Sequence, residues 1–110
     1  MEEPEKYVNW TANALLMVSD IYDYLENVSG EDFASRYIDD LLEFGNHLNT
    51  ESEHFSYCRN AILQAKGYRC ATFRKSYVVI YKEDPARVNI LAVIHSKRSP
   101  EVFGAVDEDA

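Results

Sequence analysis

Apolar residues in the first half of the chain recur at helical spacing. Between residues 12 and 28 they lie three and four positions apart and form one wide apolar face, with acidic residues on the opposite side. Thr11 is suited to cap the start of this helix, and Ser29 and Gly30 end it. A second stripe of the same period follows from Phe33 to Leu48, so the pattern predicts two consecutive helices.

The link between these helices is short, which favours an antiparallel helical hairpin. Ser29 followed by Asp32 is close to a capping box, with Asp in place of the usual Glu. The polar residues of both helices are mainly acidic, so we expect an acidic outer face on the hairpin.

The period changes to that of strands after Gly67. Residues 68–74, 77–82 and 88–95 are rich in β-branched and aromatic residues, and the last two segments are apolar on both faces. Short connections join them, so they predict a three-strand antiparallel meander with two central strands. Pro85 bars a continued ladder in the second connection.

Two further segments complete the predicted order of elements. Residues 7–11 alternate like a short strand, which we expect to join the same sheet, and residues 49–67 suggest a polar loop and a short helix near 55–64. The fold class is therefore α+β, with one sheet covered by the hairpin. We expect one domain over residues 1–110, ordered from about 6 to 103, with frayed ends.

The formal net charge of −8 hides a strong asymmetry. Residues 1–54 hold two basic and thirteen acidic residues, whereas residues 55–104 hold nine basic and three acidic residues, and residues 105–110 add three acids. The acidic total argues against a general nucleic-acid binder, while the local excess of +6 allows one basic face on the sheet.

Several functional classes receive no support. No apolar run approaches the roughly 20 residues of a membrane span, and the acidic N-terminus is unlike a secretory signal, so we expect a cytoplasmic protein with no membrane partner. Cys58 and Cys70 lack metal-ligand spacing and are interpreted as two buried thiols, with a disulfide as the alternative in an oxidising compartment. His47 and His54 are interpreted as surface residues, so neither a metal nor another cofactor is expected.

Three short motifs in the strands carry a family resemblance. They are a Gly-x-Arg strand at Gly67–Arg69, a Tyr-x-x-x-Tyr strand at Tyr77–Tyr81, and an apolar strand that ends in His-x-x-Arg at His95–Arg98. Together with the order of elements they resemble the RelE/ParE toxins of bacterial type II toxin–antitoxin systems over residues 7–103. The long helical hairpin is most like the ParE branch.

The resemblance implies a toxin that inhibits DNA gyrase by binding it, and a cognate antitoxin that neutralises it. The basic sheet and the segment after its last strand are the candidate contact surface. The candidate partner-binding residues are Arg74, Lys75, Lys97, Arg98 and Phe103.

The RelE branch offers an alternative, a ribosome-dependent mRNA endoribonuclease. In that case His95, Arg98 and Arg69 would be the catalytic residues, because cleavage needs a group that moves protons and cations that hold phosphate. No second acid or base is evident near His95, which favours binding over catalysis. A third possibility is a degenerate, non-toxic module that only binds antitoxin.

Structural roles compete with these functional ones. His95 fits a hydrogen-bonded residue at the end of a buried strand, on the face of Leu91 and Val93. Arg69 fits a brace of the sheet through carbonyls or a carboxylate such as Glu43, and Tyr77 and Tyr81 fit packing positions.

Overall fold

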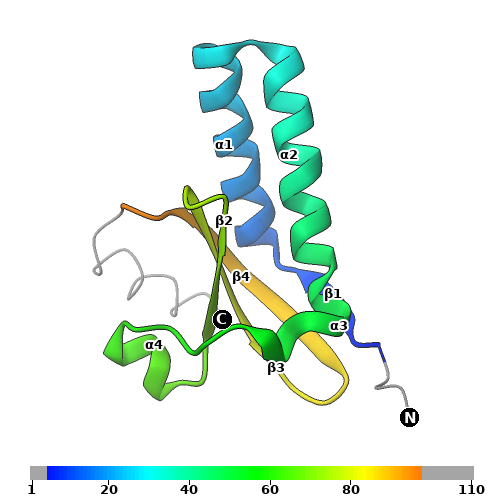
Figure 1. Cartoon of the computed structure of the whole chain (residues 1–110), viewed down its shortest axis with the longest axis vertical. Helices are drawn as coiled ribbons and strands as arrows, with labels where there is room; N and C mark the ends of the chain where they lie inside the picture. The colour runs from blue at the N-terminus through cyan, green and yellow to red at the C-terminus, as the bar shows by residue number, and fades with distance from the viewer. Residues whose placement is uncertain (1–4, 98–110) are drawn as a thin grey trace.

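The protein was analysed as a computed structural model, which describes residues 5–97 (Figure 1). A helical hairpin stands on one face of a four-stranded sheet, so the predicted α+β class is confirmed. The elements are β1 (Tyr7–Trp10), α1 (Ala12–Ser29), α2 (Glu31–Asn46), α3 (Leu48–Glu51), the 3₁₀ turn η1 (Ser52–His54), α4 (Ala61–Ala65), β2 (Arg69–Phe73), β3 (Tyr77–Glu83) and β4 (Arg87–His95).

The two long helices begin and end where their caps are satisfied. The Thr11 hydroxyl accepts a hydrogen bond from the Ala14 amide at the start of α1, as predicted. Gly30, with φ +89°, ends α1 and begins α2, and its amide donates to the Glu26 carbonyl. The expected capping box at Ser29 is wrong, because Ser29 is still the last residue of α1 and no side chain caps α2.

The sheet has the order β1-β4-β3-β2. β2, β3 and β4 form the expected antiparallel meander, and β1 joins as a parallel neighbour of β4. β3 and β4 are therefore the two central strands, which agrees with their apolar character on both faces.

A β-bulge in β4 changes which side chains share a face. Ile80 pairs with Ala92, but the next residue, Tyr81, pairs with Ile90, so Leu91 is an extra residue on β4. The extra residue reverses the alternation at this point. His95 consequently lies on the face of Val93 but not of Leu91, and the expectation that all three share a face is wrong.

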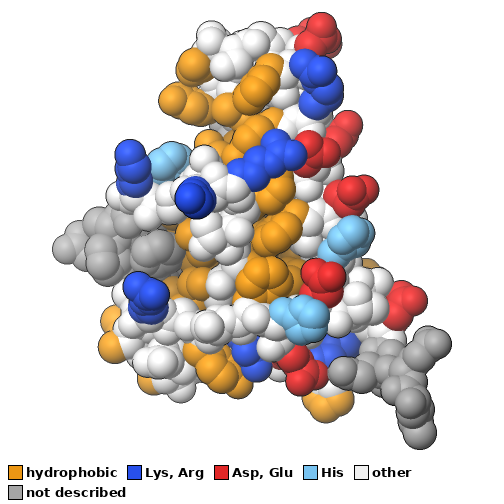
Figure 2. Space-filling model, in the orientation of Figure 1, with side chains coloured by type: hydrophobic (Ala, Val, Ile, Leu, Met, Phe, Trp, Pro, Cys, Tyr) orange, Lys and Arg blue, Asp and Glu red, His pale blue; other side chains and the backbone are white. Residues whose placement is uncertain are grey.

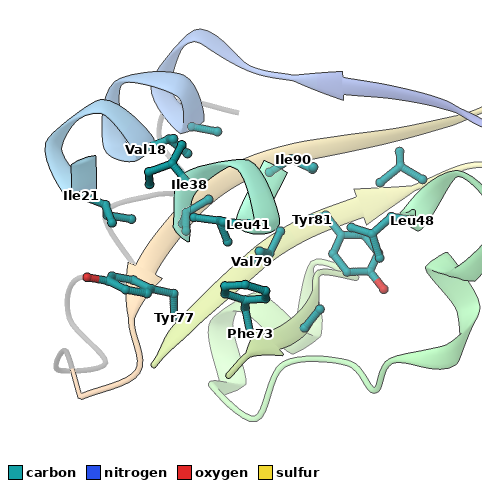
Figure 3. Packing of buried hydrophobic residues seen from close by; sticks show 14 of the residues in the cluster. Val18, Ile21, Ile38, Leu41, Leu48, Phe73, Tyr77, Val79, Tyr81 and Ile90 are labelled. Atoms are coloured by element: carbon teal, nitrogen blue, oxygen red, sulfur yellow. The ribbon is translucent and has the colours of Figure 1, made fainter. Parts of the chain in front are cut away.

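The main core lies between the hairpin and the sheet (Figure 3). Val18 and Ile21 of α1 and Ile38 and Leu41 of α2 point down onto the strands. The strands contribute the following buried side chains: Ala71, Phe73, Tyr77, Val79, Tyr81, Val88, Ile90 and Val93. This arrangement follows from the helical and alternating patterns of the sequence.

The opposite face of the sheet carries a second, smaller core. It is covered by residues 55–68, here called the cap, whose buried members include Cys58, Leu63 and Tyr68. Cys58 forms a disulfide with Cys70 of β2, and the Cα atoms of the pair lie 4.9 Å apart. The interpretation of these residues as free thiols is thus wrong, because the fold brings the cap back against β2.

The segment between α2 and β2 differs from its expected form. Instead of one helix near residues 55–64, it contains α3, followed directly by η1, and then α4 after six non-helical residues, 55–60. Leu48 belongs to α3 rather than α2 but is still buried in the main core. The predicted apolar face from Phe33 to Leu48 therefore continues past the end of α2, because Leu48 packs against the same core as the apolar residues of α2.

The close contact between α2 and β1 depends on Gly45. A Cβ atom at this position would overlap the indole ring of Trp10, whose Nε1–H donates to the Asn46 side chain at 2.8 Å. We predict that Gly45→Ala lowers the free energy of unfolding by about 2 kcal/mol, although alanine favours a helix by about 1 kcal/mol over glycine. Chemical denaturation would measure this loss. Asp39→Ala, at an exposed position of the same helix, should change stability by less than about 0.5 kcal/mol, and a more stable Gly45→Ala protein would contradict the packing.

Candidate functional site

Basic side chains gather at one end of the sheet. Arg74 and Lys75 form the turn between β2 and β3, and Lys97 follows β4, which ends beside that turn. The two segments are joined because the Ser96 amide donates to the Ser76 carbonyl at 2.8 Å and the Ser96 hydroxyl donates to the Lys75 carbonyl at 2.9 Å. Figure 2 shows Lys and Arg side chains here and acidic side chains along α2. We call Arg74, Lys75 and Lys97 the basic end.

The turn of the basic end has an unusual backbone. Arg74 and Lys75 have φ values of 51° and 62°, in the left-handed region that glycine or asparagine normally occupies in such hairpins. Arg74 is held in place by Asp40 of α2 at 2.6 Å, and its guanidinium lies 4.7 Å from the centre of the Phe73 ring. The strained turn is therefore supported from below and directs the Lys75 side chain into solvent.

A cavity of about 500 Å³ adjoins the basic end, between α1 and the end of β4. Its lining includes apolar residues such as Met17, Ile21 and Val93, together with polar residues. Those polar lining residues are Asp20, Tyr24, Tyr77, His95 and Lys97. The cavity thus combines an apolar floor with groups of both charges, which suits a side chain or small ligand with a polar end.

His95 is partly buried between the cavity and β3. Its ring meets the Tyr77 ring edge-on at 5.3 Å, and its Nδ1 accepts a hydrogen bond from the Lys97 amide at 3.1 Å. Accepting this bond fixes Nδ1 as unprotonated in the neutral ring. The structural role expected for His95 is present, while the same ring lines the cavity.

Tyr77 is buried in the main core and also reaches the cavity. Burial raises the pKa of its phenol, and the neighbouring Tyr37 and Tyr24 raise it further. Tyr77 therefore remains protonated around neutral pH and is suited to donate a hydrogen bond to whatever enters the cavity.

Asp20 and Tyr24 belong to the cavity, but sequence reasoning did not select them. They lie one turn apart on the flank of α1, in line with the apolar Met17 and Val28. Their spacing shows that they share a helix face, yet only the packing of α1 across the sheet decides that this face meets His95.

Arg69 lies at the other end of the sheet. Arg69 pairs with Tyr81 of β3, whereas His95 pairs with Tyr77 of the same strand, so the two residues are offset by four positions, about 13 Å, along the strand direction. The guanidinium binds Glu83 at 2.8 Å and donates to the Phe55 carbonyl at 2.5 Å. Arg69 thus braces the sheet as expected, with Glu83 rather than Glu43 as its carboxylate.

Glu83 is the centre of a partly buried network. Its carboxylate contacts Lys6 and Arg69 and accepts a hydrogen bond from the Ser52 hydroxyl at 2.8 Å. Burial opposes its ionisation, but the hydrogen bonds from Lys6 and Ser52 and the charges of Lys6 and Arg69 outweigh that effect, so the pKa of Glu83 is lowered. The Tyr81 hydroxyl donates to the Ser52 carbonyl at 2.6 Å and ties the network to the main core.

The structure therefore brings together three of the five predicted partner-binding residues. Arg98 and Phe103 lie outside the described residues. His95 adjoins the basic end, whereas Arg69 does not. Within residues 5–97, no cluster of three or more His, Cys, Asp or Glu side chains could hold a metal ion, and none of the helices there has the length and apolar character needed to cross a membrane.

Comparison with known proteins agrees with this architecture. Residues 8–100 match the family model described as "ParE toxin of type II toxin-antitoxin system, parDE". The chain belongs to the ParE toxin family. Among solved structures, a chain of the "Chromosomal ParDE TA system from P. aeruginosa" has the same fold, with a TM-score of 0.72 and 19% sequence identity over 84% of this chain and 98% of that chain. No curated protein matches the sequence.

Membership of the ParE family confirms the resemblance that the strand motifs suggested. In this ParE-family toxin the motif tyrosines Tyr77 and Tyr81 are buried on the helix-covered face, and the motif arginine Arg69 is held by Glu83. The first two motifs therefore mark packing and bracing positions of the fold. In the basic end, Arg74 and Lys75 lie outside the motifs, and Lys97 lies within the His95–Arg98 motif.

The network around Glu83 gives a pH-dependent contribution to stability. We predict that Glu83→Gln lowers the free energy of unfolding at pH 7 by about 3 kcal/mol, because Lys6 and Arg69 lose their carboxylate in a partly buried site. The folded pKa of Glu83 lies below its ordinary value of 4.5, so this stabilisation is present above that value and disappears as the pH falls through the folded pKa. Urea denaturation at pH 7 and pH 3 would measure both effects.

A matched control is available in the same network. Glu53 also faces Lys6, at 3.8 Å, but its side chain is 63% exposed. Glu53→Gln should therefore change the free energy of unfolding by less than about 0.5 kcal/mol. An equal loss for both variants at pH 7, or a Glu83→Gln loss that is undiminished at pH 3, would contradict the role assigned to Glu83.

Proposed function

We propose that this ParE-family toxin acts by binding DNA gyrase and blocking its cycle, and that a cognate antitoxin neutralises it. The observation that supports gyrase binding is the basic end, where cations from two separate segments meet beside a cavity. Lys75 and Lys97 form no ion pair with any residue in the 5–97 range. Their charge remains available to an acidic surface, or to the phosphates of the DNA that a topoisomerase holds.

Arg69, a predicted catalytic residue of the endoribonuclease alternative, is less suited to contact a target. Arg69 is occupied by Glu83 and Phe55, so the cation that would have to join His95 in a phosphate-binding set is used within the fold. The basic end has a different character, since only Arg74 among its three members has a carboxylate partner in the described range, and that pair is half exposed.

Charge reversal tests the basic end. We predict that Lys75→Glu combined with Lys97→Glu raises the concentration of toxin needed to inhibit gyrase supercoiling by about tenfold or more, because like charges would face the target. Arg59→Glu, at an exposed position of the cap, reverses one positive charge elsewhere and should leave the inhibition unchanged; Lys75→Glu and Lys97→Glu, each made singly, are the variants matched to it in charge. If the wild-type toxin does not inhibit gyrase from its native host, the proposal fails; if both reversals act equally, the contact is not at the basic end.

A different surface suits the antitoxin. The far half of the hairpin exposes three apolar side chains, Tyr24, Val28 and Phe33, at 60%, 63% and 44% of their surface, which we call the hairpin patch. Figure 2 shows apolar side chains grouped there. The hairpin also carries eight exposed acids and one exposed base: Asp20, Asp23, Glu26, Glu31, Asp32, Asp39, Asp40 and Glu43, with Arg36. An antitoxin segment with apolar anchors between Lys or Arg residues would complement both features.

This contact has its own measurement. We predict that Tyr24→Ala or Phe33→Ala weakens binding of the cognate antitoxin by about tenfold or more, since exposed aromatic residues often anchor interfaces. Calorimetric titration of the purified pair would report the change, and affinity should fall as salt rises. Tyr7→Ala removes a similarly exposed aromatic ring, 64% exposed, at the opposite end of the molecule and should have no effect. Equal affinity for all three variants would rule out the hairpin patch.

One observation favours the endoribonuclease as a second candidate. Asp20, Tyr24 and Tyr77 line the same cavity as His95, so groups able to move protons stand near the histidine after all. Incubation of the purified toxin with ribosomes and mRNA separates this activity from gyrase inhibition. Cleavage that is lost in His95→Ala would favour the nuclease, and intact mRNA beside inhibited gyrase would exclude it.

A further inference from the structure

The Cys58–Cys70 disulfide joins the cap to β2. Cys58 belongs to the cap and is only 1% exposed, whereas Cys70 lies on β2 and is partly exposed. Figure 1 shows α4, the helical part of the cap, beside the end of β2 and away from the helical hairpin. The cap contributes Cys58, Leu63 and Tyr68 to the second core, while its first residue, the partly buried Phe55, packs against the main core.

The base of the cap is held independently of the disulfide. The Arg69 guanidinium donates to the Phe55 carbonyl at 2.5 Å and lies 4.2 Å from the centre of the Tyr57 ring. The Cys70 amide also donates to the Ser56 carbonyl at 3.2 Å. These contacts keep the chain just before Cys58 next to Cys70, so the two thiols would remain close neighbours after reduction.

The middle of the cap has weaker support. α4 contains only five residues, and a helix of that length is not stable without packing or covalent closure. Its inner side chain Leu63 is fully buried, while Ile62 is 53% exposed. The disulfide closes a loop across this segment, since its cysteines are 12 positions apart in the sequence, and thereby restricts its opening.

We propose that Cys58–Cys70 is a reversible redox modification site, opened by a dithiol reductant, and that its state controls local opening of the cap. This proposal goes beyond the toxin activity and does not depend on the identity of the target. In the oxidised form the cap is closed on the second core. In the reduced form residues 59–67 open frequently, while the main core and the base of the cap stay folded.

The exchange is balanced in thiols and electrons. A thiolate of the reductant attacks the Sγ atom of Cys70, the more accessible sulfur, and forms a mixed disulfide as the bond to Cys58 breaks. The Cys58 thiolate takes a proton from solvent. The second thiolate of the reductant then attacks the reductant sulfur that is bonded to Cys70. This attack breaks the mixed disulfide and releases Cys70 as a thiolate. The protein gains two electrons, and the reductant leaves as its own disulfide.

Limited trypsin digestion reads the state of the cap directly. Arg59 and Lys66 are both exposed and lie within the loop that the disulfide closes. Cleavage by trypsin after these residues therefore reports opening of this segment. The full-length toxin is treated with oxidised glutathione, and one half is then reduced with dithiothreitol. We expect cleavage in residues 59–67 to be on the order of 100-fold faster in the reduced sample, while amide hydrogen exchange in β3 and β4 stays within about threefold. Reoxidation should restore the slow rate.

Three results would overturn the proposal. Two free thiols after treatment with oxidised glutathione would mean that the disulfide does not form. Equal cleavage in both samples would mean that it does not control the cap, and faster exchange throughout β3 and β4 would mean that reduction unfolds the whole protein. The double variant Cys58→Ala with Cys70→Ala should show the fast cleavage with and without dithiothreitol. If that variant does not fold, the wild-type comparison decides by itself.

Discussion

Burial of the central strands β3 and β4 on both faces is the constraint on which the rest of the structure depends. Each apolar face needs its own cover, and the chain provides two: the helical hairpin on one side and the cap on the other. β3 and β4, with 7 and 9 residues, are also longer than the outer strands β2 and β1, so they extend past the positions at which those strands pair with them. Hydrophobic burial thus sets the layers, and the ends of the sheet are left for polar chemistry.

The two ends of the sheet use their cations in opposite ways. At one end Lys6 and Arg69 are matched by Glu83, and the charges stabilise the junction of β1, the cap and β3. At the other end Lys75 and Lys97 project from a strained turn and the end of β4 toward solvent. In the first arrangement the cations are paired with a carboxylate within the fold. In the second, the lysine charges remain available to a partner. This difference is the physical basis for proposing that the basic end contacts a partner.

The β-bulge at Leu91 connects the fold to the site. Beside the bulge, the Ile90 carbonyl accepts hydrogen bonds from the Thr11 amide at 3.1 Å and the Thr11 hydroxyl at 2.8 Å, and the Asn13 side chain donates to the Leu91 carbonyl at 3.3 Å. These bonds hold the start of α1 against β4. They place α1 so that its flank, with Asp20 and Tyr24, forms one wall of the cavity beside His95. The attachment of the start of α1 to β4 beside the bulge therefore contributes to which helix residues line the cavity.

Much of the fold could be predicted from the sequence, because it depends on local periodicity. The helical stripes, the alternation of the strands and the Thr11 cap are each written within a few consecutive residues, and they specified both long helices, the meander and the ParE family. The acidic hairpin and the basic second half were also evident, since charge is a property of composition. The expectation for the segment between α2 and β2 failed because its short helices are stabilised by packing rather than by their own pattern.

Only the tertiary structure decided which distant residues meet. The partner of Arg69, the disulfide between Cys58 and Cys70, the shift of His95 away from the face of Leu91, and the cavity shared by His95 and Asp20 all depend on how separate elements pack. Spacing along the chain carries no information about these pairs, because the register of a bulged strand and the docking angle of a helix are set by the whole core. The sequence therefore determined the elements and the family, while the core determined the site.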